Sequence, residues 1–236
     1  FIVSWPRLEN FKGRDQKLDD IHQQLLDGAV GVNSAISAGL SGMGGIGKTQ
    51  LAVEYAYRYR YYYPAGVYWI NGAADWSQEL VALSDRLRLE PADKSDTDRV
   101  KQKIIALEGQ LNKRASDEKG EALIVMDNVE NPADVVNRLL ANGAAIFGTA
   151  ASFCSQAHAK LLITTRRQDL PIGLVKIEVN VLDPFDARAI LLDVRPTELD
   201  IASIDLLCRA VGYLPLPLAW FAAAIRADSS LTPAEL

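Results

Sequence analysis

The stretch from Gly42 to Thr49 constrains this chain more than any other. It reads Gly-Met-Gly-Gly-Ile-Gly-Lys-Thr and fits the pattern G-x-x-x-x-G-K-[ST] over its whole length. Glycines allow a tight turn that directs several backbone N–H groups at one phosphate, and a following helix adds the positive end of its dipole. An apolar run from Val30 to Ala38 precedes the loop, as the motif requires. We therefore predict a phosphate-binding loop rather than a glycine-rich turn that binds nothing.

The residue types in this loop assign its chemistry. We expect Lys48 to reach the β- and γ-phosphates of a nucleotide and the Thr49 hydroxyl to bind Mg²⁺. The candidate nucleotide-binding residues of the loop and the start of the helix are Gly42, Gly44, Gly45, Ile46, Gly47, Lys48, Thr49 and Gln50.

Apolar runs alternate with amphipathic patterns up to about residue 182. After the loop, strand-like runs cover about 67–71, 121–128, 160–167 and 175–182. Helical patterns cover about 15–26, 48–59, 76–90, 97–114 and 133–141. This alternation predicts an α/β fold, a P-loop NTPase three-layer sandwich with a central parallel sheet.

The pattern becomes purely helical after Asp183-Pro184. Helical patterns follow at about 184–194, 199–211 and 215–227. We predict a nucleotide-binding domain over 1–182 and a small all-helical subdomain over 183–236. The stretch 142–159, rich in Gly, Ala and Ser, has no clear period, and we expect a surface loop or a partly helical insertion.

Two further strands end in groups that suit a nucleotide, because ligands of open parallel sheets bind beyond the carboxyl ends of the strands. Asp127 follows four apolar residues and resembles the acid that holds Mg²⁺; alternatively it only caps a helix. Arg166 ends the next run and can bind a γ-phosphate by bidentate hydrogen bonds; alternatively it is a charge in solvent. We expect Lys48 and Asp127 to converge beyond adjacent strand ends.

The segment from Tyr55 to Tyr63 holds most of the tyrosines of the chain. We interpret it as a helix end packed on the sheet with its phenol tips reaching water. The alternative is a base-stacking surface with interleaved arginines.

Charge and cysteine content exclude several classes of protein. The formal net charge of −5 argues against a nonspecific nucleic-acid binder, so we expect no direct nucleic-acid binding. Cys154 and Cys208 are the only cysteines, which favours a reducing compartment, and we expect a cytoplasmic protein without a membrane span. The chain starts at Phe1 without an initiator Met or signal peptide, and we interpret it as a piece of a longer protein.

Five ordered segments carry a family resemblance. They are Phe11–Asp15, the loop Gly42–Thr49, the run Leu123–Asp127, the run Leu162–Arg166, and Gly212–Leu216 followed by Leu218-Ala219. In this order they resemble the hhGRE, Walker A, Walker B, TTR and GLPLAL motifs of the NB-ARC nucleotide-binding module, found in the STAND class of signalling NTPases.

The resemblance implies roles for matched residues. Phe11, Lys12 and Arg14 would lie at the adenine or ribose of ATP or ADP. Pro215 would pack on the base, although it can also be a plain helix-start proline. The resemblance implies Asp127, Asn128 and Arg166 as the catalytic candidates, with Thr49 and Asp127 at Mg²⁺.

Two positions depart from the family pattern. Asn128 stands where the family usually has a second Asp, and an amide can orient water but cannot take its proton. Pro217 stands in place of the usual Ala.

The resemblance implies a switch. ADP would hold a closed monomer, and ATP would open it for assembly with its own protomers, with slow hydrolysis. An upstream effector and a downstream sensor or repeat domain would lie outside this chain, in defence or cell-death signalling. The alternatives are a nucleotide-controlled STAND transcriptional regulator and, less favoured, a P-loop kinase or hydrolase acting on a small substrate.

Overall fold

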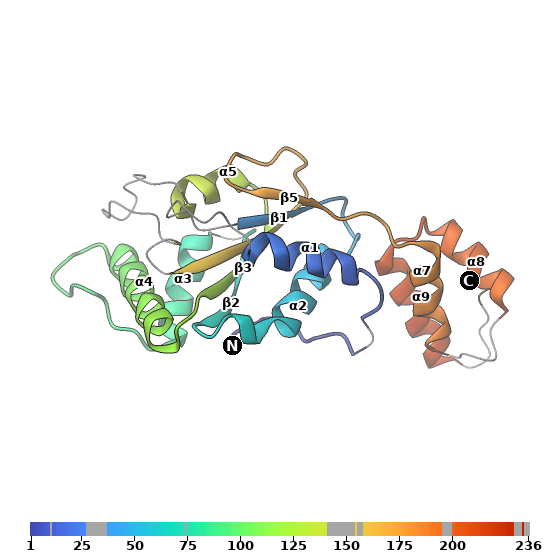
Figure 1. The fold of residues 1–236 in the computed structure, drawn as a ribbon, viewed down its shortest axis with the longest axis horizontal. Coiled ribbons are helices and arrows are strands. Elements are labelled where there is room, and N and C mark those ends of the chain that lie inside the picture. Colours follow the sequence, from blue (N-terminus) through green and yellow to red (C-terminus); the bar gives the residue numbers. More distant parts are fainter. Residues whose placement is uncertain are drawn as a thin grey trace.

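The sheet of the protein is fully parallel. The computed structural model describes residues 1–9, 11–26, 37–73, 75–140, 154, 158–194, 200–228 and 233. Its five strands are β1 (Ser37–Ser41), β2 (Gly66–Asn71), β3 (Ala122–Val129), β4 (Ala159–Thr165) and β5 (Val175–Glu178). They pair in the order β2-β3-β4-β1-β5, which confirms the predicted α/β architecture (Figure 1).

The described helices follow the periodic segments of the sequence. They are α1 (Asp15–Leu26), α2 (Lys48–Arg58), α3 (Trp76–Arg86), α4 (Arg99–Glu118), α5 (Pro132–Val135, continued by a π turn over Val136–Leu140), α7 (Pro184–Leu192), α8 (Ile201–Ala210) and α9 (Pro215–Ala227). Several begin where a short polar side chain accepts a hydrogen bond from a backbone N–H of the first turn. These caps are Asp75, Asp98, Asn131, Asp183 and Asp200.

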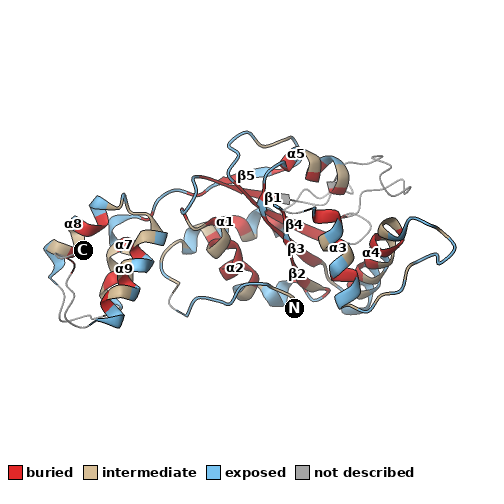
Figure 2. Cartoon of the chain, turned by 180° about the vertical axis from the view of Figure 1, so that it is seen from behind, coloured by how far each residue is buried: buried red, intermediate tan, exposed pale blue. Residues whose placement is uncertain are grey.

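Successive strand residues point to opposite faces of the sheet, and each face has its own core. Val67 and Trp69 of β2 pack with α1 and α2, whereas Tyr68 and Ile70 pack with α3 and α4. Figure 2 shows the central strands buried along most of their length, which explains their almost continuous apolar sequences. The sheet and the helices on its two faces form the three layers.

The helices after β5 have a separate core. Leu182, Leu191, Ile204, Leu218 and Ile225 are all buried in one cluster that the three helices share. In Figures 1 and 2 these helices lie together at one end of the molecule. The division of the chain at Asp183 remains our proposal.

Three predictions about the strands were wrong. β4 lies between β1 and β3, so the loop and Asp127 do not belong to adjacent strands. β3 continues past Asp127 to Val129, and β5 ends at Glu178 rather than near residue 182. A crossover helix can return the chain to any strand position, so strand order could not be obtained from the order of segments alone.

The tyrosine segment is more buried than we expected. The hydroxyls of Tyr55 and Tyr63 lie 2.5 Å apart inside the core. Tyr61 and Tyr62 are exposed, and Tyr57 and Tyr59 are half-buried, so the prediction that phenol tips reach water fails for Tyr55 and Tyr63. The predictions for 30–36 and most of 142–159 lie outside the described residues.

Candidate functional site

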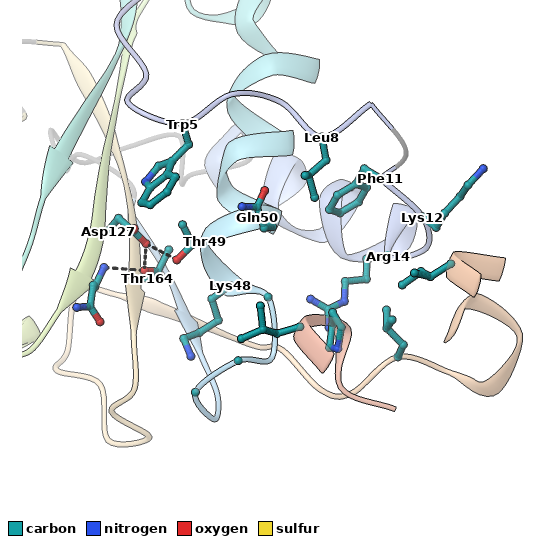
Figure 3. Close-up of a pocket in the computed structure, with 18 of the residues that line it drawn as sticks. Trp5, Leu8, Phe11, Lys12, Arg14, Lys48, Thr49, Gln50, Asp127 and Thr164 are labelled. Atoms are coloured by element: carbon teal, nitrogen blue, oxygen red, sulfur yellow. Dashed lines mark hydrogen bonds between the residues drawn. The ribbon is translucent and has the colours of Figure 1, made fainter. Parts of the chain in front are cut away.

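A cleft of about 520 Å³ opens beyond the carboxyl ends of β1, β3 and β4 (Figure 3). Four parts of the chain line it: the glycine-rich loop with the start of α2, the carboxyl ends of β3 and β4, the amino-terminal segment before α1, and residues of the helical cluster. The cleft therefore lies between the sheet and the helical part of the molecule.

Gly47 begins α2 in a conformation that other residues rarely adopt. Its φ is +88°, in the left-handed region. A Cβ at this position would lie 3.0 Å from Arg14 Nη1 and 3.5 Å from Pro215 Cγ. The loop backbone thus closely approaches both the amino-terminal segment and α9, and a side chain at this position would disturb both contacts.

Lys48 folds back over the loop. Its Nζ donates hydrogen bonds of 2.7 and 2.8 Å to the carbonyl oxygens of Gly42 and Met43. Burial lowers the pKa of Lys48, and the nearby positive charge of Arg166 lowers it further, with Asp127 opposing. An anion between Lys48 and Arg166 would relieve this repulsion, so the arrangement favours a bound phosphate.

Asp127 is oriented by two hydroxyl groups. Thr49 Oγ1 donates to Asp127 Oδ1 at 2.8 Å, and Thr164 Oγ1 donates to the same oxygen at 2.6 Å (Figure 3). Because both hydroxyls bond Oδ1, they do not compete for Oδ2. The carboxylate is buried, yet it lines the cleft.

The backbone bulges at this carboxylate. Met126 pairs with Ile163 and Val129 with Thr165, so Asp127 and Asn128 together face Thr164 alone. Asn128 takes a φ of +61°, and its backbone N–H donates to Thr164 Oγ1 at 2.8 Å. Asn tolerates left-handed backbone better than most residues, which gives Asn128 a conformational role besides any chemical one.

Arg166 reaches the loop from the end of β4. A Cβ on Gly44 would lie 4.0 Å from the guanidinium carbon of Arg166. Arg166 is exposed and lines the cleft on the same side as Lys48 and Asn128. It is therefore placed to contact the outer end of a bound phosphate chain.

Arg14 lies at the opposite end of the cleft. Its Nη2 donates to the carbonyl oxygen of Asn180 at 3.0 Å. Burial lowers the pKa of the guanidinium to about 10, and the Asp186 carboxylate opposes that shift, so Arg14 stays charged at neutral pH. Phe11 and Pro215 line the same end of the cleft.

Gln50 has an unsatisfied acceptor. Its Oε1 is buried and has no hydrogen-bond partner in the described structure. Gln50 lines the cleft, so a ligand hydroxyl or amine could supply the missing donor if the side chain turned toward it.

The cleft brings together most of the residues that the sequence predicted. Those that line it are Phe11, Lys12, Arg14, Gly44, Gly45, Gly47, Lys48, Thr49, Gln50, Asp127, Asn128, Arg166 and Pro215. Gly42 and Ile46 do not line it. Ile46 is buried in the core, and a Cβ on Gly42 would clash with the carbonyl oxygen of Val179.

Sequence analysis did not select six other lining residues as site residues: Trp5, Leu8, Thr164, Leu182, Ile190 and Leu216. Thr164 had a signal, since it directly precedes the Thr165-Arg166 pair at the strand end. Trp5 and Leu8 had none, because they come from an irregular segment that only the tertiary fold brings to the cleft.

The residues present fit a magnesium–nucleotide complex. The Thr49 hydroxyl and the Asp127 carboxylate are oxygen ligands of the kind Mg²⁺ prefers, and phosphates and water can complete an octahedral shell. In the part of the chain that is described, no group of three His, Cys, Asp or Glu side chains could hold a metal alone.

Comparisons with solved structures place the fold. A STAND protein with a tetratricopeptide repeat sensor from Pyrococcus horikoshii has a TM-score of 0.54 and 19% identity, over 96% of this chain and 31% of that chain. Cdc6p from Pyrobaculum aerophilum has a TM-score of 0.59 and 17% identity, over 96% of this chain and 63% of that chain. The fold is that of a P-loop NTPase.

A third neighbour belongs to the same group of folds. The Aeropyrum pernix ORC1 protein in complex with DNA has a TM-score of 0.54 and 17% identity, over 93% of this chain and 60% of that chain. The chain thus spans less than two thirds of each neighbour. The sequence matches no protein-family model and none of the curated proteins. Within the described residues, no helix combines the length and the apolar character needed to cross a membrane.

Proposed function

We propose that the chain is the ATP- and ADP-binding switch module of a STAND signalling protein of the NB-ARC type. The observation that carries this proposal is the cluster of Lys48, Thr49, Asp127 and Arg166 around one cleft that the helical subdomain also lines. The nucleotide-binding domain forms one side of this cleft and the helical subdomain forms the other. A ligand that contacts both sides favours their closed arrangement, so the conformation can depend on which nucleotide is bound.

The base would lie at the Arg14 end of the cleft. Phe11, Leu8 and Pro215 supply apolar surface there, and Gln50 lines the same cleft. The phosphates would extend along the loop toward Lys48 and Arg166. Mg²⁺, when bound, would neutralise phosphate charge. In this arrangement ADP stabilises the closed monomer, and ATP favours opening and assembly with other protomers.

Hydrolysis by this module should be slow. Asn128 occupies the place of the usual second acid, and general-base help is typically worth about 10²–10⁴-fold in rate. Lys48 and Arg166 still position and stabilise the phosphates, so some turnover survives. A slow ATPase suits a switch whose active state must outlast its signal.

The partners in this proposal are adenine nucleotide, copies of the same protein, and effector and sensor domains outside this chain. The ORC1 neighbour is in complex with DNA, but that protein extends well beyond the matched region. With a net charge of −5, we propose that this module itself binds no nucleic acid and works in the cytoplasm. Defence or cell-death signalling is the biological context we favour.

Titration calorimetry with ADP and Mg²⁺ tests the proposal on the Lys48→Ala variant. We expect at least about a 100-fold loss of affinity, because a charge-assisted phosphate contact is removed. Lys113→Ala is the matched control, since the exposed Lys113 side chain pairs with Asp117 one turn along α4. Wild-type affinity in a folded Lys48→Ala protein would refute the assignment of the loop.

A further inference from the structure

One short segment of the nucleotide-binding domain contacts the helical part on the other side of the cleft. It consists of Lys12, Gly13 and Arg14, and we call it the brace. Arg7, which precedes it, donates hydrogen bonds of 2.8 and 2.9 Å to the buried Glu54 carboxylate of α2. Oδ1 of Asp15, which follows it, lies 2.5 Å from Nη1 of Arg58 in α2. Both ends of the brace are therefore fixed to the helix that starts at the phosphate loop.

The brace makes two polar interactions, one with the helical part and one with the connection that leads to it. Lys12 Nζ lies 3.4 Å from Asp193 Oδ1, at the end of α7. Arg14 donates to the carbonyl oxygen of Asn180, which lies in the connection between β5 and α7. One contact thus holds the far end of α7 and the other holds the connection that precedes it.

The third contact is steric. Gly13 has a φ of +70°, and a Cβ there would lie 2.9 Å from the Cβ of Asp186 and still closer to its carboxylate. The Cβ of Asp186 is fixed to the backbone of α7, so only a movement of α7 could make room. The first turn of α7 is packed directly on the brace.

None of these three contacts involves a nucleotide. We propose that the brace is an intramolecular latch that holds the helical subdomain closed even in the nucleotide-free protein, through Lys12–Asp193 and the packing of Gly13 on α7, while Arg14–Asn180 fixes the connection that precedes α7. The inference rests on the proposed switch, whose opening would require that these contacts break. Nucleotide then adds to a closure that the chain already has, and it need not create that closure.

The test measures the distance between the two parts of the molecule without nucleotide. Spin labels are attached at Gly109→Cys on α4 and Ala223→Cys on α9, two exposed positions, and the distance is measured by pulsed electron resonance. The native Cys154 and Cys208 are buried, so the labels go to the introduced cysteines.

The two single variants act on residues that do not line the cleft. Asp193→Lys reverses the charge opposite Lys12, and since exposed ion pairs contribute little, we expect the open population to rise about threefold to tenfold. Gly13→Ala forces overlap with α7 and should raise the open population about tenfold or more. Lys12→Glu combined with Asp193→Lys restores the pair and should return the distance distribution of the parent protein.

Asp20→Lys is the matched control, because the Lys17–Asp20 pair has a similar distance, 3.3 Å, and lies on α1 away from the helical part. The latch is refuted if Asp193→Lys and Gly13→Ala leave the distances unchanged, or if Asp20→Lys shifts them equally. Calorimetry with ADP on the unlabelled protein is independent of this result. A protein that binds no nucleotide but opens in Asp193→Lys would retain the latch and lose the proposed function.

Discussion

Thr164→Val removes one hydroxyl that serves two groups at the bulge. The side chain is 1% exposed, donates to Asp127 Oδ1 at 2.6 Å and accepts from Asn128 N–H at 2.8 Å. Valine keeps the shape but leaves the half-buried N–H of Asn128 without this acceptor and the carboxylate with one donor fewer. An orphaned buried donor costs about 1–3 kcal/mol and a hydrogen bond to a charged group about 1.5–3 kcal/mol. The two effects overlap at one site, so we expect a total loss near 2–3 kcal/mol.

Urea unfolding without nucleotide measures this loss in the free energy of unfolding. Thr164→Ser keeps the hydroxyl and loses one methyl group, about 0.8 kcal/mol, so it should be clearly more stable than Thr164→Val. The Mg²⁺-dependent part of ADP affinity should also fall about 10–100-fold in Thr164→Val, since the carboxylate loses a group that orients it.

Thr165→Val is the matched control for metal binding. Thr165 is equally buried, but its hydroxyl donates to the Val129 carbonyl oxygen and does not contact Asp127. Thr165→Val should lower the free energy of unfolding and leave the Mg²⁺-dependent part of ADP affinity unchanged. If Thr164→Val is as stable as Thr164→Ser and binds Mg²⁺ and ADP like the parent protein, the role we assign to this hydroxyl is wrong.

Three further predictions use other residues. Asn128→Asp should raise single-turnover ATP hydrolysis by restoring an acid in a backbone conformation that Asp also tolerates; an unchanged rate in quench-flow assays would contradict this. Burial raises the pKa of Glu54 but the Arg7 and Arg58 hydrogen bonds outweigh it, so the folded pKa lies below the ordinary value of 4.5. The stability that Glu54 provides is thus complete above pH 4.5 and is lost as the pH falls through the folded pKa, so the stability gap to Glu54→Gln should narrow in urea titrations as the pH is lowered below 4.5; a constant gap would exclude this ionic contribution. Burial raises the pKa of Glu108 from 4.5 to about 7, so the fold loses stability as the pH rises from 4.5, and the loss is complete above about pH 7. Relative to the parent protein, Glu108→Gln should therefore gain more in melting temperature at pH 8 than at pH 4; equal shifts at both pH values would argue against burial as the cause.

Local patterns in the sequence were sufficient for much of the fold. The amphipathic spacing of Leu18, Ile21 and Leu25 predicted α1 with its observed bounds, because a helical stripe is encoded within a few residues. The glycine pattern of the loop and the apolar run before Asp127 placed the main groups of the cleft for the same reason.

The rest depended on contacts between distant segments. The bulge at Asp127 and Asn128 arises from pairing with Thr164, and no periodic signal marks an extra residue in a buried strand. Trp5 reaches the cleft because Ile2 pairs with Tyr68 of β2 and Arg7 pairs with Glu54, two contacts across the fold. The insertion of β4 between β1 and β3 likewise needed the three-dimensional structure.

The insertion of β4 also determines which parts of this protein can move. β1 carries the loop with Lys48, β3 carries Asp127 and β4 carries Arg166, and the three strands are hydrogen-bonded to one another through β4 in the middle. The strand ends that carry these groups cannot separate without breaking the ladder between neighbouring strands. The phosphate side of the cleft is accordingly built on one rigid sheet, and we expect its backbone geometry to be the same with ADP and with ATP. A difference between two states of the module should then appear as a change in the tilt of the helical part relative to the sheet, with the polypeptide between β5 and α7 bending to allow it.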